Sequence, residues 1–120
     1  MKLLIVDDSL VIRRALERSL KFHSFESIQA AQNGAIALKL FKDNPADVVT
    51  MDITMPEMDG LTCIESIIKI NPSTRILVIT ALSDKGTAVE AVKRGAQGFL
   101  LKPFTVDDVN EALSDLLEDL

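Results

Sequence analysis

The chain has 120 residues, of which 48% are hydrophobic and 26% are charged, and its formal net charge is −5 at pH 7. This length fits one domain, residues 1–120, and the apolar content excludes an intrinsically disordered composition. The acidic balance and the lack of a basic run argue against direct DNA binding, which depends on Lys and Arg contacts to phosphates.

The first apolar run, Leu3–Val6, predicts a short strand. Ile12, Leu16 and Leu20 then repeat every four residues, which predicts a helix with charged residues such as Arg13 facing solvent. The apolar runs are all far shorter than the roughly 20 residues of a membrane-spanning helix. We therefore expect no membrane insertion. Acidic residues follow the first strand too soon for a signal peptide, and a cytoplasmic protein is expected.

A second strand is predicted at Ile28–Ala31, followed by a helix that Ala37, Leu38 and Phe41 mark and that ends near Asn44. A third strand is predicted at Val48–Met51. The helix after it carries the single cysteine, Cys63, which we expect in the core, and one cysteine excludes an intrachain disulfide. Its apolar positions are Leu61, Ile64, Ile67 and Ile68.

The last two strands are predicted at Ile76–Ile79 and Phe99–Leu101. Between them Ala88, Val89 and Val92 mark a helix, and Gly95 is placed to cap it. In the final helix, Thr105 and Asp108 have the spacing of a capping box. Its apolar positions are Val106, Val109, Leu113, Leu116, Leu117 and Leu120.

Five strand–helix units in alternation predict a doubly wound (βα)5 α/β fold of the flavodoxin-like kind. The strands show little polar alternation, which is typical of a parallel sheet covered by helices on both faces. Right-handed crossovers place helices on each side. The expected five-stranded parallel sheet has the order 2-1-3-4-5.

Polar residues follow four of the five predicted strands. Asp7 and Asp8 follow the first, Asp52 the third, Thr80 the fourth and Lys102 the fifth. In open α/β sheets, ligands bind beyond the carboxyl ends of the strands, near the point where the strand order reverses. The first and third strands are neighbours there, so the three aspartates are expected to converge in one pocket.

Each of these residues has an ordinary structural explanation when it is taken alone. An aspartate after a strand is usually a turn former or a helix cap, and Ser9 could simply cap the first helix. Lys102 could be a solvated charge, and Thr80 a strand-end hydroxyl bonded to backbone. These explanations do not account for the clustering of all five polar residues at one edge, nor for three close carboxylates without a counter-charge.

Crowded carboxylates repel one another, and a divalent cation relieves that repulsion. Mg²⁺ prefers oxygen ligands and binds through a few carboxylates together with water. Lys102 adds a positive charge to the pocket and Thr80 adds a hydroxyl donor. Carboxylate, metal, cation and hydroxyl are the parts required for phosphoryl transfer to a carboxylate, with Mg²⁺ as the expected cofactor.

The chain resembles the response-regulator receiver family, and most of all its single-domain chemotaxis regulators. The resemblance covers essentially the whole chain. Four sequence blocks in the family's order and spacing carry it: Asp7-Asp8, Val49–Gly60 (VTMDITMPEMDG), Thr80-Ala81 and Gly98–Phe104 (GFLLKPF).

The resemblance implies a role for each matching position. Asp52 matches the phospho-accepting aspartate, Asp8 the acidic residue that binds Mg²⁺ directly, and Asp7 the one that acts mainly through bound water. Thr54 matches the position whose backbone carbonyl completes the metal site. Lys102 matches the lysine that contacts the phosphoryl group, with a cis bond to the following proline.

Thr80 and Phe99 resemble the family's switch pair, although tyrosine is common at the position of Phe99. The family further implies a sensor histidine kinase of the chemotaxis type upstream. Downstream it implies a target protein such as a flagellar-motor switch component. The expected function is that of a phosphorylation-activated interaction protein that turns over no independent substrate.

Two other functions compete with this interpretation. Phosphatases of the haloacid dehalogenase type also use an aspartate at a strand end with Mg²⁺, but they carry a second aspartate two residues later, where this chain has Thr54. A nucleotide or flavin binder on the same fold would need a glycine-rich phosphate loop after the first strand, and none is present in the sequence.

Overall fold

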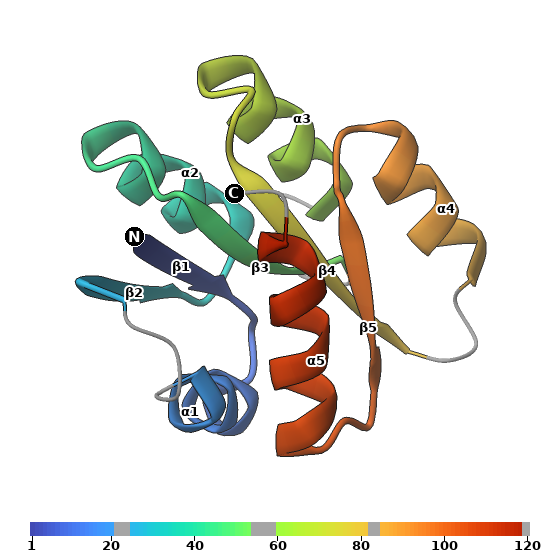
Figure 1. Cartoon of the computed structure of the whole chain (residues 1–120). Coiled ribbons are helices and arrows are strands. Elements are labelled where there is room, and N and C mark those ends of the chain that lie inside the picture. Colours follow the sequence, from blue (N-terminus) through green and yellow to red (C-terminus); the bar gives the residue numbers. More distant parts are fainter. Residues whose placement is uncertain (21–24, 54–59, 82–84, 119–120) are drawn as a thin grey trace.

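The computed structural model describes residues 1–20, 25–53, 60–81 and 85–118. Strands and helices alternate along the described chain (Figure 1). The strands are β1 (Lys2–Val6), β2 (Ser27–Ala31), β3 (Val48–Asp52), β4 (Arg75–Ala81) and β5 (Gly98–Lys102). The helices are α1 (Leu10–Ser19), α2 (Gly34–Asp43), α3 (Gly60–Ile70), α4 (Lys85–Lys93) and α5 (Val106–Leu117).

The five strands form one parallel sheet in the order β2-β1-β3-β4-β5, as the sequence predicts. Each predicted strand lies inside an observed strand. The observed strands are longer because polar residues at their ends, such as Lys2, Arg75 and Lys102, also pair with neighbouring strands.

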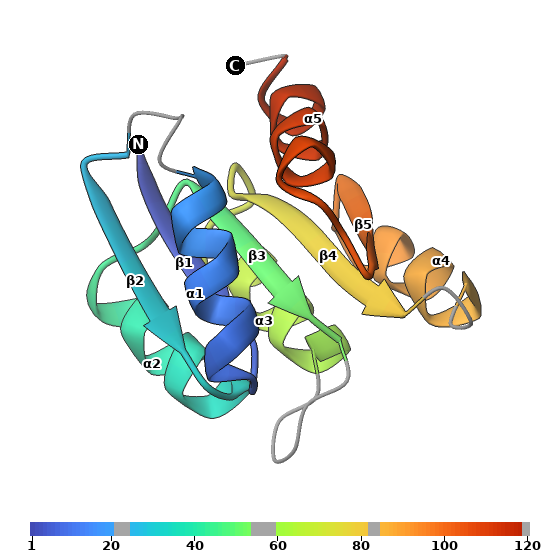
Figure 2. The ribbon, with the colours of Figure 1, turned by 90° about the horizontal axis from the view of Figure 1, so that it is seen from below.

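Helices cover both faces of the sheet and bury two separate apolar clusters (Figures 1 and 2). Helices α2, α3 and α4 lie on one face, where Phe41 of α2, Ile67 of α3 and Ala91 of α4 are buried. Helices α1 and α5 lie on the other face, where Leu16 and Leu113 are buried. Among the described residues, none of the helices has the length and apolar character that crossing a membrane requires.

The expectation that all the strands are buried on both faces is wrong for β2 and β5. These are the edge strands of the sheet, and their residues alternate or are only partly covered. Ile28 of β2 is 36% exposed, whereas every residue of β3 is buried. An edge strand has a neighbour on one side only, so helices cover it less completely.

Helix α4 packs through small residues rather than through the valines that mark it in the sequence. Ala88 and Ala91 are buried, while Val89 and Val92 are 56% and 49% exposed. Val106 at the start of α5 is also exposed. The apolar pattern therefore locates both helices correctly but assigns these three valines to the wrong face.

The predicted helix ends are confirmed by the local hydrogen bonds. Ser9 is the N-cap of α1, and its hydroxyl accepts a hydrogen bond from the Ile12 backbone N–H. Thr105 and Asp108 form the capping box of α5. Gly95 follows α4 with a φ of 125°, a left-handed conformation that favours glycine.

Thr50, in the middle of β3, is fully buried, and its hydroxyl has no hydrogen-bond partner among the described residues. A buried hydroxyl without a partner loses its hydration without compensation. We expect Thr50→Val to raise the free energy of unfolding by about 1 kcal/mol in urea denaturation. In the matched control, Thr74→Val, a hydroxyl that donates to the Ala46 carbonyl at 3.1 Å is removed.

The control should lower the free energy of unfolding by about 1 kcal/mol, because it leaves a buried carbonyl without its donor. A stability loss of the same size in both variants would show that the Thr50 hydroxyl has a partner.

Candidate functional site

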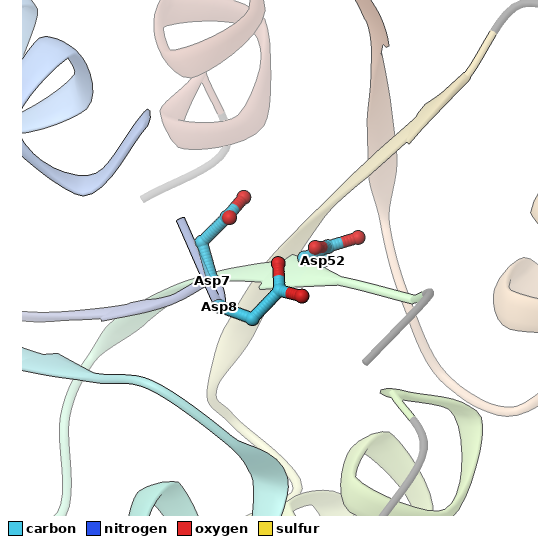
Figure 3. Close-up of side chains that lie close together, drawn as sticks. All are labelled: Asp7, Asp8 and Asp52. Atoms are coloured by element: carbon cyan, nitrogen blue, oxygen red, sulfur yellow. The ribbon is translucent and has the colours of Figure 1, made fainter. Parts of the chain in front are cut away.

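Three carboxylates meet at the carboxyl edge of the sheet, as the sequence predicts. Asp7 and Asp8 directly follow β1, and Asp52 is the last residue of β3, the strand that pairs with β1 (Figure 3). One carboxylate oxygen from each residue lies within 4.8 Å of the others. Asp7 and Asp52 are 0% and 2% exposed, whereas Asp8 is exposed. The site is therefore buried on one side and open to solvent at Asp8.

Asp7 is held in place through both its side chain and its backbone. Its carboxylate accepts a hydrogen bond from the Ser9 backbone N–H at 2.9 Å. Its backbone N–H donates to the Ala31 carbonyl at the end of β2. The Arg13 guanidinium donates to its backbone carbonyl at 2.6 Å. These bonds fix the start of the loop that joins β1 to α1.

The contact of Arg13 corrects the sequence-based expectation that this side chain faces solvent. Arg13 is half-buried and turns back from the first turns of α1 toward the carboxylate cluster. Helical periodicity places Arg13 beside the apolar stripe but gives no information about the carbonyl that it reaches. Its guanidinium adds a second positive charge near the site.

Lys102 is the last residue of β5, and its side chain reaches both buried aspartates. Its Nζ lies 3.3 Å from Asp7 Oδ2 and 3.6 Å from Asp52 Oδ2. The strand register explains this arrangement, because Leu100 and Lys102 lie on the same face of the sheet as Asp52. The Lys102–Pro103 peptide bond is cis, as the family resemblance implies.

Thr80 and Phe99 share one side of the sheet. Thr80 pairs with Leu101 and Val78 pairs with Phe99, so alternation along both strands puts Thr80 and Phe99 on the face that α4 covers. Thr80 is 1% exposed, whereas the Phe99 side chain is 53% exposed. Thr54, the predicted source of a metal-binding carbonyl, lies outside the described residues.

The described residues fit a divalent cation. Three carboxylates within reach of one another supply the oxygen ligands that Mg²⁺ prefers, and the exposed side of Asp8 leaves access for water. Lys102 balances only part of the negative charge, because one ammonium faces two buried carboxylates. The charge and chemistry of the site therefore favour binding of a cation.

Gly60 begins α3 against the end of β3, beside Asp52. A Cβ atom at Gly60 would lie 2.5 Å from Ile53 Cα and 2.6 Å from the Asp52 carbonyl oxygen. Such contacts force the backbone apart. We expect Gly60→Ala to lower the free energy of unfolding by about 2 kcal/mol or more in urea denaturation.

Gly86 in α4 is the matched control, because a Cβ there would meet nothing within 4 Å. Gly86→Ala should stabilise the protein by about 0.5 kcal/mol through helix propensity. Equal stability of the two alanine variants would contradict the close packing at Gly60.

Comparison with known proteins agrees with the fold. The family model "Response regulator receiver domain" matches residues 3–114. The chemotaxis protein CheY of Listeria monocytogenes is 42% identical over 113 residues, covering 94% of this chain and 95% of its own length. CheY of Bacillus subtilis is 40% identical over 116 residues, covering 97% of each chain.

Among solved structures, the chain is similar to one in the CheX–CheY–BeF3–Mg²⁺ complex from Borrelia burgdorferi. The TM-score is 0.89 at 31% identity, and the match covers 97% of this chain and 88% of that one. The fold and site define a flavodoxin-like α/β protein with an acidic cluster at the switch point of its sheet. The chain belongs to the response-regulator receiver family and is homologous to the CheY chemotaxis regulators, which makes it a protein of two-component signalling.

Proposed function

We propose that the protein is a single-domain response regulator that accepts a phosphoryl group on Asp52 and signals through a protein-binding surface. The observation that carries this proposal is the placement of Asp52. Its buried carboxylate lies 3.6 Å from the Lys102 ammonium and within reach of two further carboxylates. Asp8 is exposed, whereas Asp7 shares the burial and the nearby ammonium, so the choice of Asp52 between the two buried aspartates rests on its match to the family's phospho-accepting position.

In the proposed reaction, an oxygen of the Asp52 carboxylate attacks phosphorus in line with the leaving group. The new O–P bond forms as the bond from phosphorus to the donor breaks, and the donor leaves with the electron pair. The Lys102 ammonium stabilises the charge on the phosphoryl oxygens, because it is already fixed beside Asp52. Low solvent access strengthens this interaction.

Asp7, Asp8 and Asp52, with the backbone carbonyl of Thr54, are the proposed Mg²⁺ ligands. When bound, Mg²⁺ supplies positive charge that offsets the phosphoryl oxygens and the carboxylates. Incubation with acetyl phosphate and Mg²⁺ should add one phosphate to the intact mass. Omission of Mg²⁺ should prevent the gain.

The proposed switch couples Thr80 to Phe99. A phosphorylated aspartate carries roughly −1.5 to −2 charge and three acceptor oxygens, and the Thr80 hydroxyl at the end of β4 can donate to one of them. Inward movement of Thr80 frees space on the side of the sheet that it shares with Phe99. Burial of a Phe side chain contributes about 1.5–3 kcal/mol, which is enough to bias two conformations.

Phe99→Ala should leave phosphorylation intact and remove most of the effect of phosphorylation on target binding. The measurement is titration of the target protein with and without Mg²⁺ and beryllofluoride, which mimics the phosphoryl group. Val11→Ala, which truncates a side chain that is 74% exposed on α1, is the control and should behave as wild type. Equal target affinity of the wild-type protein in both states would refute the switch.

The partners follow from the relatives, which are named chemotaxis proteins. We place a chemotaxis-type histidine kinase upstream and a flagellar-motor switch component downstream, both in the cytoplasm. The protein itself turns over no independent substrate, so p-nitrophenyl phosphate should not be hydrolysed catalytically. Side-by-side phosphorylation by purified histidine kinases should identify the cognate one by its rate.

A further inference from the structure

A groove of about 400 Å³ runs between β5 and α5, next to the exposed ring of Phe99. Its apolar lining includes Phe99, Leu101 and Pro103 from the β5 side and Ala112 from α5. A second hollow of about 330 Å³ shares Phe99, Ala112 and Asp115 with the first and also includes Val92 of α4. Phe99 therefore contributes to the lining of both hollows.

The charged lining of both hollows, among the described residues, is entirely acidic. Asp108, Glu111 and Asp115 line the first, and Asp115 also lines the second. Their spacing along α5 places them on one face of the helix, which turns its acidic side to the groove. No Lys, Arg or His occurs between Val106 and Leu117.

From this groove we infer that the target segment of the output partner is basic and apolar: an arginine-bearing peptide that lies along β5. The inference rests on the proposed output surface around Phe99 and names the chemistry that this surface selects. Arginine suits the groove, because its guanidinium binds carboxylates in a bidentate manner and its aliphatic stem packs on apolar surface. Apolar side chains of the same segment cover Leu101, Pro103 and Ala112.

The position of β5 gives the segment a place to bind in extended form. β5 is an edge strand, so its outer backbone side faces away from β4. An extended peptide can add to such an edge, with alternate side chains reaching the groove. The carboxylates repel acidic peptides, nucleic acids and anionic lipid surfaces, and a protein segment of opposite charge is the partner that fits.

The test uses a ten-residue peptide of alternating arginine and leucine and a counterpart with glutamate in place of arginine. Binding is measured by fluorescence polarisation on the full chain, with and without Mg²⁺ and beryllofluoride. The arginine peptide should bind at least about tenfold more tightly than the glutamate peptide, and added salt should weaken its binding. The double variant Glu111→Gln/Asp115→Asn should lose about tenfold in affinity.

The double variant Glu17→Gln/Asp43→Asn is the matched control, because it removes the same charge from exposed sites on α1 and at the end of α2. It should bind within about twofold of wild type. Equal losses in the two double variants would show that only net charge matters and would overturn the inference. NMR shifts of the backbone amides should change at Phe99 and Ala112, and changes confined to α1 would also overturn it.

Failure of this inference and failure of the proposed function give different results. Phosphorylation on Asp52 without a preference for the arginine peptide would support the proposed function and contradict the basic partner. A preference for the arginine peptide in the groove without phosphorylation on Asp52 would support the basic partner and contradict the proposed function.

Discussion

Asp52→Asn should abolish phosphorylation by acetyl phosphate in Mg²⁺. Asparagine has nearly the same shape as aspartate, but its amide is not a nucleophile and carries no negative charge for a metal. The measurement is intact-mass spectrometry over time, on the wild-type protein and the variant side by side. We expect a gain of one phosphate for wild type and no gain for the variant.

Asp43→Asn is the matched control, because Asp43 is an exposed carboxylate at the end of α2, away from the cluster. It should be phosphorylated at the wild-type rate. Phosphate on the Asp52 variant at the wild-type rate would show that another group is the acceptor, and Asp7 and Asp8 would then be the first candidates.

Lys102→Met should destabilise the protein when no divalent cation is present. Methionine keeps much of the length of the side chain but removes the ammonium that lies 3.3 Å from Asp7 and 3.6 Å from Asp52. The buried carboxylates of Asp7 and Asp52 then lose the ammonium group that offsets part of their negative charge. Because Lys102 is 28% exposed, the loss should be about 2 kcal/mol, less than for a fully buried pair.

The measurement is urea denaturation of both proteins in EDTA and again in Mg²⁺. The loss should be smaller in Mg²⁺, because a bound cation restores positive charge beside the carboxylates. Lys39→Met is the control, since Lys39 is exposed on α2, and it should change stability by less than about 0.5 kcal/mol. An unchanged Lys102 variant in EDTA would contradict the electrostatic role of this residue.

Much of the fold can be predicted from sequence, because apolar runs mark the strands and helices and turn residues separate them at regular intervals. Val48–Met51 and Ile76–Ile79 are buried on both faces of the sheet, and their continuous apolar character shows it. Ile28 carries no such information, because the sequence does not show that its strand lies at an edge. The exposure of Val89 and Val92 depends on how α4 approaches the sheet, which a helical pattern alone does not define.

The convergence of Asp7, Asp8, Asp52 and Lys102 could be predicted because parallel strands end at the same edge. Arg13 could not, because a hydrogen bond to a backbone carbonyl depends on the path of the loop between β1 and α1. The acidic groove likewise requires the positions of β5 and α5 relative to each other. The spacing of Asp108, Glu111 and Asp115 defines a helix face but not the strand beside it.

Asp52 is the residue proposed to receive the phosphoryl group, and one measurement tests this assignment most directly. The protein is treated with acetyl phosphate and Mg²⁺, and the acyl phosphate is then reduced with borohydride, which converts a phosphorylated aspartate to homoserine. Tandem mass spectrometry of the peptides locates the product. We expect homoserine at position 52 in place of aspartate, and homoserine at position 7 or 8 would contradict the assignment of Asp52.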